Sequence, residues 1–116
     1  MSGTKFFWMT GAVSSFLDNA PTYISFASVA AGLCGASADD LGSILATPIG
    51  AHWLAAVSCG AVFMGANTYI GNGPNFMVKS IAEERGVAMP FFGYMLWALA
   101  VMIPVHLATT FVFFSR

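Results

Sequence analysis

Asp18-Asn19-Ala20-Pro21-Thr22 is a polar, helix-breaking stretch inside an otherwise apolar segment. Residues 6–17 before it and 20–38 around and after it carry no charge. A carboxylate is costly inside a bilayer, and a proline interrupts helical hydrogen bonding at the same depth. Many secondary transporters build an ion or substrate site from a polar group beside a broken helix. We therefore expect a functional site at this stretch.

Composition extends the membrane interpretation to the whole chain. Of the 116 residues, 58% are apolar and only 8% are charged, and the mean hydropathy is +0.77. Soluble domains carry about a quarter charged residues. The uncharged runs 41–78 and 86–115 each exceed the roughly 20 residues that cross a bilayer as a helix. The sequence predicts an all-α membrane protein, and four basic residues with a net charge of −1 exclude a nucleic-acid surface.

The first unit, residues 1–33, can be one long tilted span or a re-entrant helical hairpin. Each arm of such a hairpin has about 12 residues, which reach ~18 Å or about half a bilayer. Asn19 lies near the middle of the unit, where the tip of a hairpin belongs. We favour the hairpin, with its tip at residues 18–22 near the membrane midplane.

A connector over residues 34–47 precedes two further units. In residues 48–85, Gly71, Gly73 and Pro74 make a continuous helix improbable, so we predict a discontinuous transmembrane helix. Residues 86–116 form a last transmembrane helix with aromatic residues at both ends. Together the units predict one membrane-embedded helical domain.

Asp18 has two interpretations. It can be a cation ligand that is protonated when the cation leaves, because burial raises the pKa of a carboxyl group. It can instead be the N-cap of the returning helix. We favour the first, because acids within membrane segments are rare and mostly functional.

Amide and hydroxyl oxygens around the two interruptions complete the predicted site, since oxygen ligands suit hard cations. The alternative role of these side chains is to join helices by hydrogen bonds. His106, in the last unit, is either a structural histidine or a proton relay. The predicted ion- or substrate-binding residues are Asp18, Asn19, Thr22, Asn67, Thr68, Asn72 and Asn75, with Asp18 and Asn19 as Na⁺ ligands.

Nothing in the chain has the spacing of a nucleophile with its base or of a bound metal cofactor. We expect no enzymatic activity and no cofactor. Na⁺ and H⁺ are expected as transported ions.

Two motifs resemble the ion transporter superfamily. Ser14-Ser15-Phe16-Leu17-Asp18-Asn19-Ala20-Pro21-Thr22-Tyr23 is similar to its hairpin, and Gly65-Ala66-Asn67-Thr68-Tyr69-Ile70-Gly71-Asn72-Gly73-Pro74-Asn75-Phe76 is similar to its following broken helix. The nearest likeness is to sodium/proton antiporters, related to NhaD-type antiporters and citrate–metal transporters. Ile81-Ala82-Glu83-Glu84-Arg85-Gly86-Val87 resembles a stretch near their carboxyl end.

The resemblance implies the C-terminal part of an elevator-type secondary transporter that is built from two inverted repeats, most simply a Na⁺/H⁺ antiporter. It also implies that the units of this chain form one partial transport domain, part of one inverted repeat. The alternatives are a citrate or organic-anion carrier of the same superfamily and a non-transporting membrane fragment or subunit. Expected partners are the lipid bilayer, an N-terminal repeat or companion chain, and a second copy through the scaffold of the full protein. The bacterial inner (plasma) membrane is the expected location.

Overall fold

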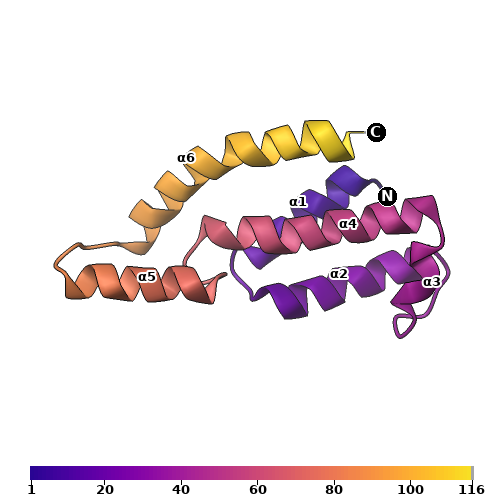
Figure 1. The fold of residues 1–116 in the computed structure, drawn as a ribbon, viewed down its shortest axis with the longest axis horizontal. Helices are drawn as coiled ribbons and strands as arrows, with labels where there is room; N and C mark the ends of the chain where they lie inside the picture. Colours follow the sequence, from indigo (N-terminus) through magenta and orange to yellow (C-terminus); the bar gives the residue numbers. More distant parts are fainter. Residues whose placement is uncertain (116) are drawn as a thin grey trace.

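A computed structural model describes residues 1–115, and every regular element among these residues is helical. Figure 1 shows the long helices running roughly along the longest axis of a molecule that measures 52 × 29 × 16 Å. The fold class expected from the sequence, all-α, is therefore confirmed. The elements are α1 (Gly3–Ser14), α2 (Asn19–Leu33), α3 (Leu41–Leu45), α4 (Pro48–Phe63), η1 (Met64–Asn67), α5 (Gly73–Glu84), α6 (Phe91–Thr109) and η2 (Thr110–Phe114).

Helices α1 and α2 form a helical hairpin with a short turn (Figure 1). The turn lies over residues 15–18, slightly before the tip expected at residues 18–22. The reason is that Pro21 occupies the first turn of α2, where backbone N–H groups have no helical partner and a proline costs little. Asp18 is the N-cap of α2. The first two helices thus return the chain to the end from which it started.

The predicted interruption of the second unit is present. Helix α4 tightens into the 3₁₀ turn η1, and α5 starts only at Gly73, after extended backbone at Thr68 and Asn72. Asn72 caps α5 by accepting a hydrogen bond from the backbone of Asn75, at 3.3 Å. Pro74 stands in the first turn of α5. A proline is tolerated in the first turn of a helix, but it could not continue a helix that began before it.

Two helical segments are long and apolar enough to cross a membrane. They are Pro48–Asn67, half of whose apolar window is buried, and Phe91–Phe114, of which 6% is buried. The exposed apolar side chains of the second segment, including Phe92, Trp97 and Phe111, suit a lipid environment. Length and composition agree here with the sequence-based expectation of an integral membrane protein.

Helix α1 packs directly on α4, and this contact organises the core. A Cβ atom at Gly60 would lie 2.4 Å from the backbone oxygen of Phe7, so the glycine allows the two helices to touch. Phe6 and Phe7 are fully buried, and the rings of Phe6 and Trp53 lie 5.4 Å apart. Phe7 also stacks on Phe114, at 5.3 Å, which attaches the end of the chain to α1.

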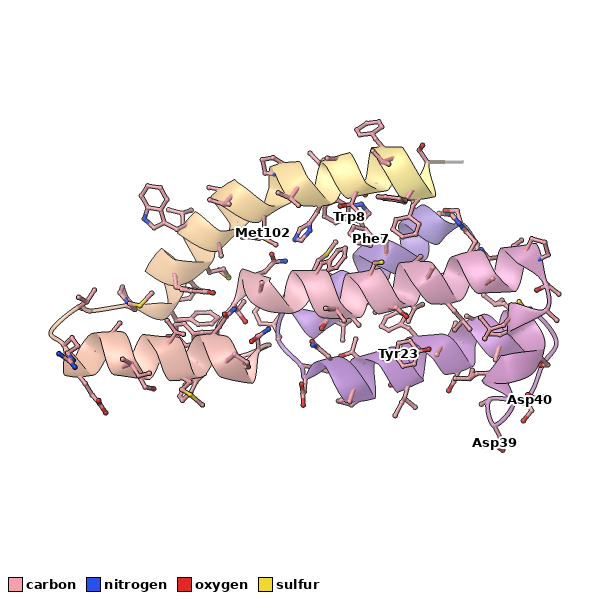
Figure 2. The ribbon with its side chains drawn as sticks, in the orientation of Figure 1. Phe7, Trp8, Tyr23, Asp39, Asp40 and Met102 are labelled. Atoms are coloured by element: carbon pink, nitrogen blue, oxygen red, sulfur yellow. The ribbon has the colours of Figure 1, made fainter. Side chains whose placement is uncertain are left out.

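The ends of the elements fall into two groups along the longest axis. The start of α1, the end of α2, Asp39, Asp40 and the end of η2 lie at one end, and the end of α5 lies at the other (Figures 1 and 2). The hydroxyl of Thr4 donates a hydrogen bond to the carbonyl of Phe114 at the first end. A re-entrant hairpin also predicts that Arg116 lies on the same side of the membrane as Lys5, but Arg116 lies outside the described residues.

Candidate functional site

The hairpin turn and the helix break contact each other. Ser15 makes the central contact, because its Oγ donates toward the carbonyls of Gly11 (2.9 Å) and Met64 (3.0 Å). Its own carbonyl accepts a hydrogen bond from the hydroxyl of Thr68, the first residue of the break. The same Thr68 Oγ1 accepts from the backbone N–H of Gly71, at 3.1 Å. One turn of hairpin backbone therefore satisfies polar groups that the interrupted helix leaves without partners.

A second set of contacts surrounds Asn19, the first residue of α2. Ser14 Oγ lies 2.5 Å from the carbonyl oxygen of Ala61 and 3.1 Å from Asn19 Oδ1. A Cβ atom added at Gly65 would lie 2.9 Å from Asn19 Oδ1 and 3.1 Å from the carbonyl oxygen of Gly71. The beginning of the returning helix, the end of α4 and the break therefore meet within a few ångströms.

Asn67 connects the break to both the hairpin and α6. Its Nδ2 donates to Ser15 Oγ at 3.0 Å, and its Oδ1 lies 3.2 Å from His106 Nε2. Asn67 is 6% exposed and His106 is 1% exposed. From the same helix, the hydroxyl of Tyr94 donates to the carbonyl of Ala66 at 3.3 Å.

The structure gathers three of the seven predicted site residues into this network: Asn19, Asn67 and Thr68. The other four lie at the beginnings of α2 and α5. Asp18 is exposed, and its Oδ1 accepts from the N–H of Asn19 at 2.8 Å, the capping geometry named above as its alternative role. Thr22 is buried and donates to the carbonyl of Asp18 at 2.9 Å.

Asn72 and Asn75 form the cap of α5 described above, and Asn75 also lines a groove of about 780 Å³ beside Tyr94 and Trp97. A smaller pocket of about 230 Å³ lies where Ser15, Asn67, Thr68 and His106 approach one another. Its remaining wall is apolar and includes Trp8 and Met95. The polar groups of the junction thus border a space large enough for a small solute.

Sequence reasoning did not assign a role to Ser14 or Ser15, although both stand directly before the predicted tip. A pair of hydroxyl residues next to a break in an apolar run was the available signal, because hydroxyls commonly satisfy freed backbone groups. His106 is bonded to a side-chain amide rather than to the backbone carbonyl expected of a structural histidine.

Charge is sparse around the junction. Asp18 is the acid at its edge, and Lys79 lies further along α5, paired with Glu83 at 2.8 Å and 5.4 Å from the centre of the Tyr69 ring. Among residues 1–115, no three His, Cys, Asp or Glu side chains are grouped in a way that could hold a metal ion. Any cation at the junction must therefore rely on amide, hydroxyl and backbone oxygens together with Asp18.

Comparison with known proteins identifies a family. The model of the family described as "Putative citrate transport" matches residues 1–114. No curated protein and no solved structure gave a match. The match supports the citrate-transporter side of the resemblance noted in the sequence and gives no support to the NhaD-type antiporters. The two apolar helices agree with an integral membrane transport protein. Because the family model covers nearly the whole chain, the chain belongs to this citrate transport family.

Proposed function

We propose that this chain forms the hairpin and broken-helix part of a secondary carrier for citrate or a related polycarboxylate. The cargo would bind where the hairpin turn meets the break and would cross without chemical conversion. One observation carries the proposal: the two interrupted segments are hydrogen-bonded to each other through Ser15, Asn67 and Thr68 in a chain of the citrate transport family.

The chemistry of the junction suits a carboxylate. Helices α2 and α5 both begin there, and the N-terminal end of a helix carries partial positive charge and unpaired N–H groups. Transporters with discontinuous helices hold anionic groups in this way. Pro21 and Pro74 lack an N–H, and the N–H groups of Asn19 and Asn75 are bonded to their capping side chains. The backbone donors left in these two first turns are therefore those of Ala20 and Gly73.

Asp18 supplies the coupling in this proposal. A carboxylate beside two helix N-termini balances part of their positive potential, and it can take up Na⁺ or H⁺ as a citrate trianion enters. Asn19, the next residue in the chain, would complete the cation ligands. Na⁺ and H⁺ are cargo here, and no resident cofactor is required.

Na⁺/H⁺ antiport is the second candidate, and the position of Asp18 favours it. Asp18 is exposed at the hairpin turn, where Na⁺ and H⁺ can compete for one carboxylate without an organic anion. The two candidates differ in a single measurement. An antiporter moves protons when Na⁺ is added alone, whereas a coupled carrier needs citrate as well.

We further propose that the hairpin is re-entrant and that an N-terminal repeat or companion chain covers the other side of the junction. The hairpin turn lies near the middle of the longest axis in Figure 1, the depth expected for a tip at the bilayer midplane. Inverted repeats place the second half of such a cavity on an oppositely oriented segment. The bacterial inner membrane is the proposed location.

Citrate uptake tests the proposal. The chain would be expressed in cells without a citrate carrier, alone and together with an N-terminal repeat of the same family. We expect uptake of labelled citrate only from the pair, and none from the 116-residue chain alone. Proton movement driven by Na⁺ without citrate would favour the antiport candidate, and absence of both activities from a well-expressed pair would refute the proposal.

A further inference from the structure

Helix α6 reaches the break with two polar side chains. Tyr94 and His106 bond to Ala66 and Asn67, which are consecutive residues of η1. His106 is 1% exposed, whereas its neighbours Val105 and Leu107 are 51% and 45% exposed. The imidazole is therefore buried in a helix that otherwise turns much of its surface outward.

Hydrogen-bond directions fix the proton of the imidazole. Ser15 Oγ uses its single hydrogen on the carbonyls of Gly11 and Met64, so it can only accept from Asn67. The NH₂ of Asn67 must then face Ser15, and its oxygen must face His106. Nε2 of His106 is consequently the donor, and the neutral ring carries its hydrogen there.

The surroundings keep the ring in this orientation. The rings of Phe7 and Trp8 stand nearly edge-on to the imidazole, at 6.1 and 6.2 Å (Figure 2 labels both). Trp8 Nε1 donates to Thr110 Oγ1 at 3.0 Å, and Thr110 Oγ1 donates to the carbonyl of His106 at 2.9 Å. Nδ1 is buried and has no partner among residues 1–115. His106 therefore acts on the junction through Nε2 alone.

We propose that His106 is the positioning residue of this junction. Its Nε2–H holds the amide of Asn67 so that the hairpin turn and the break remain bonded in one arrangement. His106 affects the bound carboxylate through Asn67 and does not itself touch the carboxylate. This functional consequence rests on the proposed carrier function. Because α6 carries the donor, a shift of α6 along its axis changes the geometry of the site.

Three substitutions distinguish this role from packing alone. In His106→Gln the side-chain amide nitrogen falls near the position of Nε2, so the donor to Asn67 is kept. In His106→Asn the amide nitrogen falls near the position of Nδ1, and the oxygen of Asn67 loses its partner. Asn is also smaller than Gln, so His106→Leu, which fills the site without a donor, controls for packing. A purely structural role would make His106→Leu resemble His106→Gln, whereas loss of the donor would make it resemble His106→Asn. We expect His106→Gln to keep half-saturation by citrate within about twofold of the parent, and His106→Asn to raise it about tenfold, the loss typical of one buried hydrogen bond.

Two measurements are needed, and the first does not depend on transport. Nitrogen-15 NMR of the 116-residue chain in nanodiscs should show the neutral His106 ring protonated at Nε2, and His52→Gln should leave that signal unchanged. A ring protonated at Nδ1 would overturn the proposal. In the second measurement, the His106→Gln and His106→Asn variants are co-expressed with the N-terminal repeat. Equal citrate concentrations at half-saturation for these two variants would also overturn the proposal. If the parent pair moves no citrate while the Nε2 signature is present, the carrier function fails and the hydrogen-bonded arrangement stands.

Discussion

Gly71→Ala tests the contact between the hairpin turn and the helix break. A Cβ atom at this position would lie 2.4 Å from the carbonyl oxygen of Ser14 and 2.7 Å from that of Ser15. Both atoms belong to the backbone, so no change of side-chain rotamer can relieve the overlap. Since the backbone of Gly71 is not in the left-handed region, the expected effect is steric and not conformational.

The cost follows from two contributions. Inserting a methyl group into a closed contact typically costs about 1–3 kcal/mol. Moving the turn away from the break also removes the Thr68–Ser15 hydrogen bond, at about 1 kcal/mol. We therefore expect Gly71→Ala to lower the free energy of unfolding by about 2–4 kcal/mol.

Gly73→Ala is the matched control. It adds the same methyl group two residues later, where a Cβ atom would meet nothing within 4 Å. We expect a change within about 0.5 kcal/mol, as for a surface substitution. Unfolding by sodium dodecyl sulfate in mixed micelles, followed by tryptophan fluorescence, measures both variants. Similar losses for the two, or no loss for Gly71→Ala, would refute the close contact between turn and break.

Three further predictions concern the same region. Ser15→Ala should destabilise the chain by about 1–3 kcal/mol in the same unfolding assay, because the buried amide of Asn67 loses its acceptor. The control Ser25→Ala, on an exposed helix face, should change the free energy of unfolding little. Asp18→Asn, in the chain paired with an N-terminal repeat, should nearly abolish cation-coupled uptake while the protein is expressed at its normal level. If coupling is unaffected, Asp18 has only its capping role. Lys5→Cys and Asp40→Cys should be labelled from the same side of the membrane, and labelling from opposite sides would replace the re-entrant hairpin by a single span.

Local sequence signals located most of the helix ends. Asp40 caps α3, with its carboxylate accepting from the N–H of Ser43 at 3.2 Å, and Gly86 ends α5 with a φ of 80°. The interruption at Gly71–Asn72–Gly73–Pro74 was also correctly predicted, since glycine and proline act on the backbone next to them. The hairpin turn was predicted at residues 18–22 but lies at residues 15–18. The prediction was a few residues too late because a proline can mark the first turn of a helix as well as a break between helices.

The partners at the junction could not be read from the sequence. Ser15 bonds to Met64, Asn67 and Thr68, and His106 bonds to Asn67, which is 39 residues away. Such pairs depend on the crossing of α1, α4 and α6, which no local pattern encodes. The cargo was uncertain for a chemical reason: helix N-termini, amides and a single carboxylate can serve a hard cation or a carboxylate, and the family match favours the latter.

The hydrogen bonds of Ser14 and Ser15 also constrain how the chain can enter a membrane during synthesis. Their partners Ala61, Met64 and Thr68 follow them by 47 to 53 residues. While the ribosome has produced only the first two helices, the polar turn between them has no protein surface to cover it, and lipid would leave its backbone groups unpaired. In the re-entrant arrangement proposed above, the hairpin would therefore wait near the membrane surface or inside the insertion machinery until η1 and the residues after it have been made. Slow translation or a pause before residue 68 would prolong that exposed stage and favour degradation over insertion.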